Sequence, residues 1–249
     1  MNIMKIQIHG AFAFFKKPDI NSIYMTYSSI HKVVLMGLFG ATVNYGGYEQ
    51  QRQSKSEYPE FYEKFKDIKT SIVPHKKFFD KKIQTYNNST GFATRQKGGN
   101  LIIKEQWIEN PAWDIYVVID SEETETLKKY IKAYKTENCR FLGRRNHECI
   151  ISNYKFYEDV SSLDGETFKI DSLFLDKNYS IQEPDVFDLI EANETYSYPY
   201  KEMLPVGLDS QFNHYLFENF VLTENPVKKN PLMKDSFLCE IEGKVLSFY

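Results

Sequence analysis

Two lysines and a proline, Lys16-Lys17-Pro18, close an apolar stretch that runs from Met4 to Phe15. Tyr27-Ser28-Ser29 follows and opens a short glycine-bearing segment, Ile30 to Val43, with the composition of a helix. A strand, a basic turn and a polar helix start in this order predict an edge that binds anions, because the free amides at a helix N-terminus point outward with the positive end of the helix dipole. The expected ligand is a polyanion.

A second basic segment is expected to form a projecting hairpin. Residues 75–104 contain seven Lys or Arg side chains and one acid. The flanks, Ile72 to Thr85 and Asn100 to Trp107, are typical of two strands around a polar tip. A long, basic and weakly apolar hairpin cannot fold back onto its own core, so we expect a thumb. The cations that would line it are Lys76, Lys77, Lys81, Lys82, Arg95 and Lys97.

Two adjacent arginines stand beside a glycine in Gly143-Arg144-Arg145-Asn146-His147. Neighbouring guanidiniums suit bidentate contact with phosphates and stacking on bases, and His147 is a further candidate in this segment. The alternative is that the arginines bridge to surface acids. Near the first basic turn, Ser29 and Lys32 are also candidates for contact with a polyanion.

Aromatic residues near the basic turn are candidates for stacking on unpaired bases, which contributes roughly 1 to 3 kcal/mol per base. These residues are Phe14, Phe15, Tyr24, Tyr27 and Tyr45. At strand spacing most of them should belong to the core. We expect Tyr27 and Tyr45 to be exposed, because both lie at the ends of elements.

The motifs of metal enzymes and nucleotide-binding enzymes are missing from the sequence. The five histidines show no His-x-x-x-His or Cys/His ligand spacing. The sequence also lacks a P-loop, a dinucleotide-binding fingerprint and a nucleophile elbow. We therefore expect no bound metal, no cofactor and no standard catalytic site.

The composition is that of a folded protein with divided charge. Of 249 residues, 42% are hydrophobic and 16% aromatic. The net charge of -3 argues against nucleic-acid binding when taken alone. However, residues 1–150 carry 23 Lys or Arg and 16 Asp or Glu, a net charge of +7, whereas residues 151–249 carry 8 and 18, a net charge of -10. The first part suits phosphate contacts, and the second suits solubility or docking on a basic neighbour.

Cysteine use and hydropathy predict a cytoplasmic protein. The three cysteines form no Cys-x-x-Cys pair, and the N-terminus has no signal-peptide pattern, which disfavours a disulfide framework. No apolar run approaches the roughly 20 residues that span a bilayer, so we expect no membrane association.

The order of the expected elements is that of an α+β protein. After the first strand, the helix and the hairpin, Ala112 to Asp120 predicts a strand, Glu122 to Tyr134 a helix and Glu148 to Phe156 a strand. The sum is β-α-β-β-α-β, the ferredoxin-like or RRM-like unit, with the hairpin inserted near its second strand. We expect this domain over residues 1–158, with the thumb at about 72–107, and a β-rich C-terminal region over 159–249.

Four motifs, spread over about 200 of the 249 residues, occur in an order that resembles a known family. The first, from His9 to Val43, reads HGAFAFFKKPDINSIYMTYSSIHKVVLMGLFGATV. The others are Asn110 to Val117, Phe141 to Cys149 and Glu202 to Pro205. They resemble the strand-turn-helix start, the Asn-Pro-x-aromatic strand, the Leu-Gly-Arg loop and the Glu-x-Leu-Pro element of the CRISPR-associated Cas-five family. This family belongs to the RAMP superfamily and supplies subunits of Cascade, the type I surveillance complex.

The resemblance implies a noncatalytic subunit that caps the 5′ handle of the CRISPR RNA (crRNA) in antiviral defence. The basic turn and the thumb would hold the handle, the thumb would contact the first Cascade backbone subunit, and the chain would dock the large subunit. Target DNA would be read indirectly, through base pairing in the complex. The N-terminal segment is most like type I-B. His31 and Lys32 stand where the family often has Pro-Ser, which is a departure from its pattern.

Two other functions stay open at this stage. Some family members cleave repeat RNA without a metal, using Tyr, Lys and His side chains. Such residue types are present as Tyr45, His31, His75, Lys76 and His147, but the sequence does not show whether they converge. A general RRM-like RNA binder would carry an aromatic RNP pattern on a strand, which residues 9–14 echo loosely.

Overall fold

The computed structural model of the chain describes residues 1–19, 22–89, 100–183, 197–232 and 237–249. Two of the cations predicted to bind RNA, Arg95 and Lys97, lie outside these ranges. Within them, no helix combines the length and the apolar composition that a membrane crossing needs.

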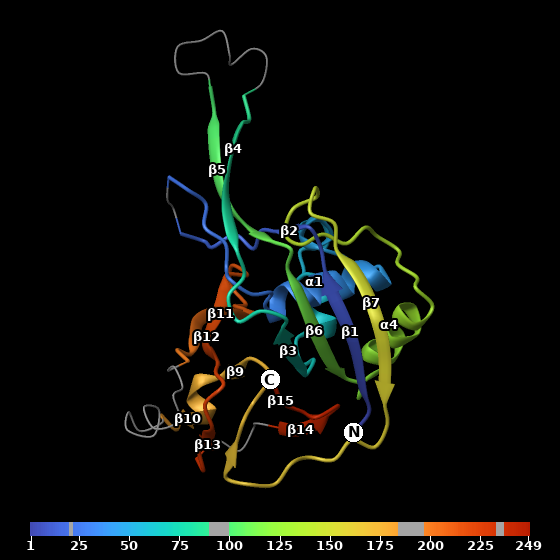
Figure 1. Cartoon of the computed structure of the whole chain (residues 1–249). Helices are drawn as coiled ribbons and strands as arrows, with labels where there is room; N and C mark the ends of the chain where they lie inside the picture. Colours follow the sequence, from blue (N-terminus) through green and yellow to red (C-terminus); the bar gives the residue numbers. More distant parts are fainter. Residues whose placement is uncertain (20–21, 90–99, 184–196, 233–236) are drawn as a thin grey trace.

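A four-stranded antiparallel sheet forms the centre of the fold (Figure 1). In order across the sheet, its strands are β3 (Thr70–Pro74), β6 (Ala112–Val118), β1 (Ile3–His9) and β7 (Ile150–Tyr157). Helices α1 (Lys32–Val43) and α4 (Glu122–Lys132) pack on one face of this sheet. The central unit therefore has the expected order β-α-β-β-α-β.

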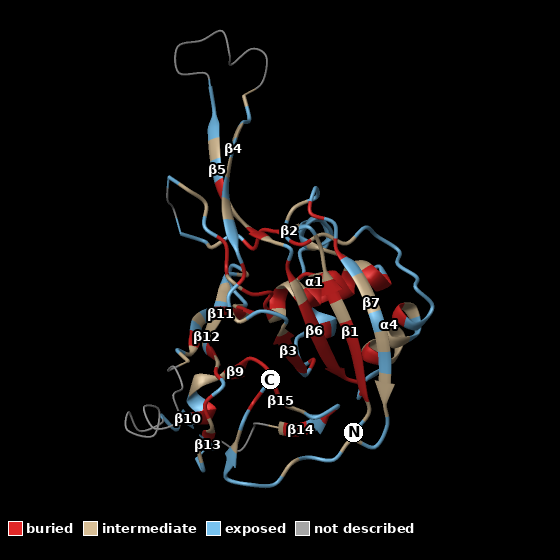
Figure 2. Cartoon of the chain, viewed as in Figure 1, coloured by how far each residue is buried: buried red, intermediate tan, exposed pale blue. Residues whose placement is uncertain are grey.

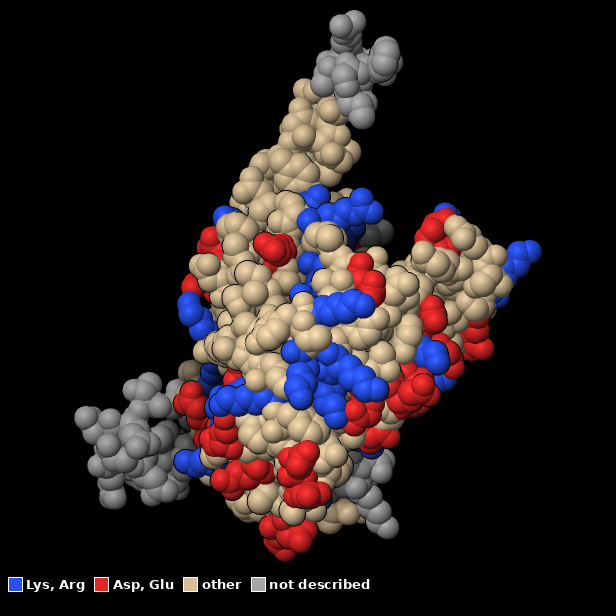
Figure 3. Space-filling model, turned by 90° about the vertical axis from the view of Figure 1, so that its right-hand side faces the viewer, with Lys and Arg blue, Asp and Glu red and all other residues tan. Residues whose placement is uncertain are grey.

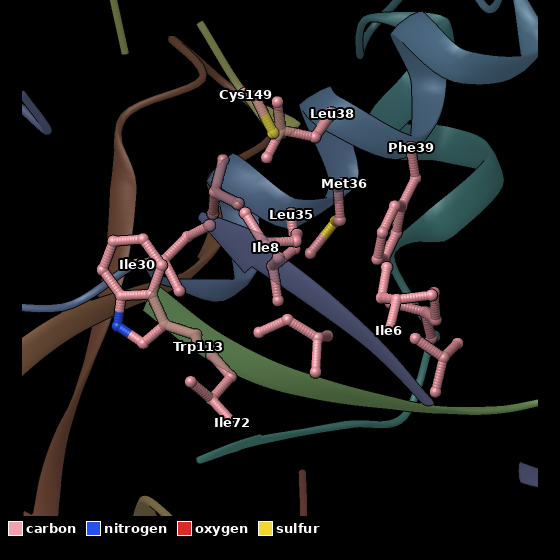
Figure 4. Close-up of a cluster of buried hydrophobic side chains, with 14 of the residues drawn as sticks. Ile6, Ile8, Ile30, Leu35, Met36, Leu38, Phe39, Ile72, Trp113 and Cys149 are labelled. Atoms are coloured by element: carbon pink, nitrogen blue, oxygen red, sulfur yellow. The ribbon is translucent and has the colours of Figure 1, made fainter. Parts of the chain in front are cut away.

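The two-residue alternation of the strands produces the core. Met4, Ile6 and Ile8 of β1 are fully buried, and they belong to the cluster that packs against α1. Figure 4 shows this cluster between Trp113 of β6 and Phe39 of α1. Figure 2 shows that buried residues concentrate in the central sheet and in α1, whereas most of the projecting hairpin is exposed or half-buried.

A C-terminal hairpin covers part of the other face of the sheet. It consists of β14 (Phe237–Ile241) and β15 (Lys244–Phe248). Its buried Leu246 belongs to a second apolar cluster with Ile3 and Tyr116 of the sheet. Both faces of the central sheet are therefore partly covered, although by different parts of the chain.

The thumb is a hairpin of β4 (Lys81–Asn87) and β5 (Ile102–Glu109), which projects from the body of the protein (Figure 1). At its base, β5 also pairs with the short strand β2 (Phe12–Ala13). The predicted continuous flank from Ile72 to Thr85 is wrong, because residues 70–74 pair with β6 in the central sheet. The thumb strands therefore start after this segment.

The outer part of the thumb, residues 86–89 and 100–103, contains no Lys, Arg, Asp or Glu, and Leu101 and Ile102 are each 54% exposed. The exposed Lys104 lies just below it, opposite Thr85. On the face that Figure 3 shows, this outer part has no blue or red side chains. The described cations of the predicted basic hairpin therefore lie at its base, except Lys104, which lies partway along β5.

The C-terminal region is β-rich, as predicted. Its elements are β8 (Thr167–Phe168), β9 (Phe174–Leu175), the 3-10 helix η2 (Asp176–Asn178), β10 (Tyr179–Ile181), β11 (Tyr200–Leu208), β12 (Tyr215–Leu222) and β13 (Val227–Lys229). The strands form two antiparallel sheets, β10-β13-β8 and β11-β12-β9. Leu204 of β11 lies in the same core cluster as α1, so this region and the ferredoxin-like unit share a core. The division of the chain at residue 158 stays a prediction.

Two glycines in α1 give a matched test of its packing. Helices α2 (Tyr48–Ser54) and α3 (Glu60–Phe65) follow α1. A Cβ atom at Gly40 would lie 2.4 Å from Cβ of Phe61 in α3, whereas one at Gly37 would have nothing within 4 Å. We expect Gly40→Ala to lower the free energy of unfolding by about 1–3 kcal/mol, because α3 has to shift.

Gly37→Ala should instead raise the free energy of unfolding by roughly 1 kcal/mol, because alanine has the higher helix propensity and meets no neighbour. Urea denaturation of both variants measures the two changes. Effects of the same sign would contradict the different roles of the two glycines.

Candidate nucleic-acid interface

A carboxylate of the protein itself occupies the edge where the sequence predicts an anion site. Glu202 of β11 accepts hydrogen bonds from the backbone N–H of Ser28 at 2.8 Å and from the Tyr200 hydroxyl at 2.6 Å. It also pairs with Lys17 at 2.8 Å. The Ser28 amide is therefore not free for a ligand, because Glu202 already accepts its hydrogen bond.

The residues that precede α1 are buried rather than exposed. The exposed fractions of Tyr27, Ser29 and His31 are 3%, 2% and 2%. The His31 ring centroid lies 5.3 Å from that of Tyr27 and 5.6 Å from that of Tyr215, and burial lowers the pKa of His31 to about 3. The expectation of an exposed Tyr27 is wrong, because α1 starts later than predicted, at Lys32, and the preceding turn packs inward.

Three lysines nevertheless keep this edge basic. Lys81 donates a hydrogen bond to the Ser28 hydroxyl at 2.7 Å, next to the Lys17–Glu202 pair. Burial lowers the pKa of Lys81, and the neighbouring Lys17 lowers it further. Lys16 is exposed. Lys17 and Lys81 lie close to the Glu202 carboxylate and Lys16 directly precedes Lys17, so cations outnumber this carboxylate at the edge, which suits a phosphate. We call Lys16, Lys17 and Lys81 the basic edge.

One arginine of the Gly-Arg-Arg segment holds the thumb. Glu105 of β5 is 5% exposed and accepts hydrogen bonds from the Tyr86 hydroxyl at 2.8 Å and the Trp107 indole at 2.9 Å. Arg144 pairs with the same carboxylate and donates to the Tyr86 hydroxyl at 2.6 Å. Of the two alternatives for Arg144, the structure therefore has the bridge to an acid.

Close backbone contact fixes the position of this loop. Gly143 has a φ of +87°, and a Cβ atom there would lie 1.9 Å from the carbonyl oxygen of Phe14. The Phe14 N–H donates to the carbonyl of Leu142 at 3.0 Å. His147 is 2% exposed with its ring centroid 4.5 Å from that of Trp107, and burial lowers its pKa. Glycine is therefore required at 143, and His147 packs at the thumb base instead of facing solvent.

A groove of about 790 Å³ lies between α1 and residues 138–145, and we call it the arginine groove. Its cationic lining residues are Arg140, Arg144 and Arg145. Glu60 is the one acid among the described lining residues. Arg145 is exposed, and the open space beside Gly37 leaves the α1 side of the groove unfilled. The groove is positively charged and open enough for a phosphate backbone.

The remaining predicted residues are not gathered in this groove. Between β3 and β4, Lys76 pairs with Asp80 at 3.2 Å and Lys77 donates to the Ser197 hydroxyl at 2.8 Å. Lys32 lines a separate hollow of about 420 Å³, and burial lowers its pKa to about 8.

Tyr45 does line the arginine groove, but it is half-buried, with its ring centroid 5.5 Å from that of Phe65. The expectation of an exposed Tyr45 is therefore met only in part. Sequence reasoning did not single out Arg140, Tyr48 or Cys139, which also line the groove. The one available signal was the basic run from 140 to 145, in which Arg140 stands close to the Gly-Arg-Arg segment.

The open face of the central sheet carries a network of ion pairs. Lys5 pairs with Asp114 at 3.3 Å and with Glu242 of the C-terminal hairpin at 2.9 Å, and His75 pairs with Asp114 at 2.8 Å. Tyr116 on this face is fully buried. The two central strands, β1 and β6, thus present no exposed aromatic ring of the kind on which an RRM stacks bases.

Solved CRISPR structures share this fold. A chain of a CRISPR RNA-guided surveillance complex matches with a TM-score of 0.52 and 11% identity over 90% of each chain. A CRISPR protein from Archaeoglobus fulgidus matches with a TM-score of 0.54 and 10% identity over 99% of this chain and 98% of that one. A chain of the type III-B Cmr-beta complex, bound to cognate target RNA and AMPPnP, matches with a TM-score of 0.50 and 10% identity over 90% and 86%. No family model and no curated protein sequence matches this chain.

Removal of the Glu105 carboxylate is expected to loosen the thumb. Glu105→Ala leaves Arg144 and Trp107 without their acceptor and should lower the free energy of unfolding by about 1–3 kcal/mol. The control Glu109→Ala removes a half-exposed pair with Lys82 on the same strand and should change it by less than about 1 kcal/mol. Urea denaturation and amide hydrogen exchange of β4 and β5 measure both effects. Equal exchange in the two variants would show that Glu105 does not hold the thumb.

The C-terminal hairpin should contribute less to stability in acid. Hydrogen bonds from Lys155 and Lys5 lower the pKa of Glu242 to about 2 from its ordinary value of 4.5. A lowered pKa in the folded state stabilises the protein above the ordinary pKa, and this stabilisation is lost as the pH falls towards about 2. Glu242→Gln should therefore be less stable than wild type at neutral pH, and the difference should shrink in acid. The control is Glu240→Gln, an exposed glutamate on β14, and a pH-independent difference for Glu242→Gln would refute the assignment.

Proposed function

We propose that the chain is a crRNA-binding subunit of a CRISPR RNA-guided surveillance complex and that it caps the 5′ handle of the crRNA. The observation that carries the proposal is the fold match, which covers 90% of this chain and 90% of a chain from such a complex. The four sequence motifs support the more specific proposal of a Cas-five subunit of a type I Cascade in the RAMP superfamily, most like type I-B. The protein would act in the cytoplasm in antiviral defence.

The arginine groove and the basic edge support RNA as the ligand. Both surfaces carry more cations than acids among their described residues, although the whole chain has a net charge of -3. On one face of the molecule, Figure 3 shows Lys and Arg side chains gathered in the middle and acidic side chains below them. Because the binding would rest on phosphate contacts, its affinity should fall steeply with salt.

The uncharged outer part of the thumb supports a protein partner there. Exposed Ile83, Leu101 and Ile102 offer apolar surface, whereas RNA contact would favour cations. We assign this surface to the first backbone subunit of the complex. A large subunit would dock elsewhere on the chain, and target DNA would be read through base pairing with the crRNA.

A noncatalytic role agrees with the placement of the histidines. His31 lies in an aromatic cluster, His75 pairs with Asp114 and His147 packs against Trp107, so each has a different set of neighbours. Within the described part of the chain, no group of three or more His, Cys, Asp or Glu side chains is placed to hold a metal ion. Because these three histidines do not converge, cleavage of repeat RNA is not part of the proposal.

Incubation of the purified protein with end-labelled repeat RNA in EDTA tests the proposal. We expect a shifted band on a native gel and intact RNA on a denaturing gel. Arg145→Gln should reduce the slope of log affinity against log salt by about 0.7, because one phosphate contact is lost. The control Arg52→Gln, which removes a guanidinium that pairs with Glu49 on α2, should leave the slope unchanged. Cleavage at one position would replace the proposal with a processing nuclease.

Cys139 provides an independent map of the bound RNA. It is exposed and lines the arginine groove, whereas Cys149 and Cys239 are buried. Bound repeat RNA should slow the alkylation of Cys139 by a maleimide, and Gly37→Leu, which extends into the groove, should weaken both binding and protection. Binding without protection of Cys139 would move the RNA site away from this groove.

A further inference from the structure

A pocket that contains no lysine or arginine lies between the arginine groove and the basic edge. Its volume is about 660 Å³. It borders Pro18, which directly follows Lys16 and Lys17, and it shares Tyr48 and Tyr215 with the arginine groove. Its described lining residues include one acid, Glu57, and no lysine or arginine. A nucleic-acid strand that runs from one basic surface to the other therefore crosses a region with no cation for its phosphates.

The wall of this pocket is held in place before any ligand binds. The Asp209 carboxylate accepts hydrogen bonds from three backbone N–H groups in the turn over residues 209–214, at 2.7 to 2.9 Å. Gln51 of α2 donates to Asn213 Oδ1 at 2.9 Å and so ties the turn to the opposite wall. A preformed pocket loses little conformational entropy when a ligand enters.

The turn presents aromatic surface to solvent. Phe212 is 66% exposed and Tyr48 is 51% exposed, and both line the pocket. Base stacking on such rings does not depend on sequence, because every base has a π face. The amide side chains of Gln51, Gln211 and Asn213 are also in the lining, and such groups bond the edges of bases. Aromatic faces, amides and the absence of cations match a nucleobase rather than a phosphate.

We propose that this pocket receives an unpaired nucleobase of the bound RNA, which stacks on Phe212 while its flanking phosphates bind the arginine groove and the basic edge. This inference rests on the proposed function and adds a base-accepting subsite to it. Two basic surfaces joined by an aromatic pocket without lysine or arginine would bend the strand out of a stack at this point and select an unpaired segment of RNA over a duplex.

Fluorescence of 2-aminopurine tests the subsite. The probe is repeat RNA with 2-aminopurine placed in turn at each position of the 5′ handle, because stacking on an aromatic ring changes its emission. We expect one position to respond in the wild-type protein. Phe212→Ala should abolish this response and weaken affinity about 10-fold, and Phe212→Trp should restore both. Since Phe212 is mostly exposed, these variants should fold normally.

The control is Tyr134→Asn, which removes another exposed aromatic ring at 78% exposure from a different hollow, and asparagine tolerates its φ of 53°. If Phe212→Ala keeps both the response and the affinity while Arg145→Gln still loses affinity, the base subsite is refuted and the proposed function stands. The pocket would then have another occupant, such as a side chain of a partner protein. Failure of the wild-type protein to bind repeat RNA would overturn both proposals.

Discussion

The buried carboxylate of Glu105 is the constraint on which the thumb and its surroundings depend. It receives donors from both thumb strands, through Tyr86 and Trp107, and from the adjoining loop through Arg144. A charge at 5% exposure is stable only while these donors satisfy it. The carboxylate therefore fixes where the thumb leaves the body, and it also orients one wall of the arginine groove.

The motifs far apart in the sequence meet at one segment of the chain. The Gly10 N–H donates to the carbonyl of Pro111, and the Phe14 N–H donates to that of Leu142. Lys17 pairs with Glu202. The first motif thus contacts each of the other three, which gives a structural reason for their joint presence. Several residues whose side chains could bind a ligand instead join distant segments of the chain.

Internal pairing decides which cations are left for a ligand. Arg144 is committed to Glu105, and Lys17 shares Glu202 with its neighbours, whereas Arg145 and Lys16 are exposed. The sequence alone does not distinguish these four side chains as candidates for ligand contact. In the structure, Arg144 and Lys17 mainly hold the scaffold in position. The exposed Arg145 and Lys16, with the aromatic pocket between them, define the proposed path of the RNA.

The sequence by itself determined the β-α-β-β-α-β order, the projecting hairpin and the β-rich C-terminal region, because strand alternation and helix composition are local signals. Only the tertiary structure decided that Tyr27, Ser29 and His147 are buried, since burial depends on which distant segment covers a residue. It also decided the partners of Glu105 and Glu202 and brought α2 against the 209–214 turn to form the pocket. The Glu202 contacts and the contact between α2 and the turn join residues more than 100 positions apart. Neither local propensity nor periodicity carries information at that range.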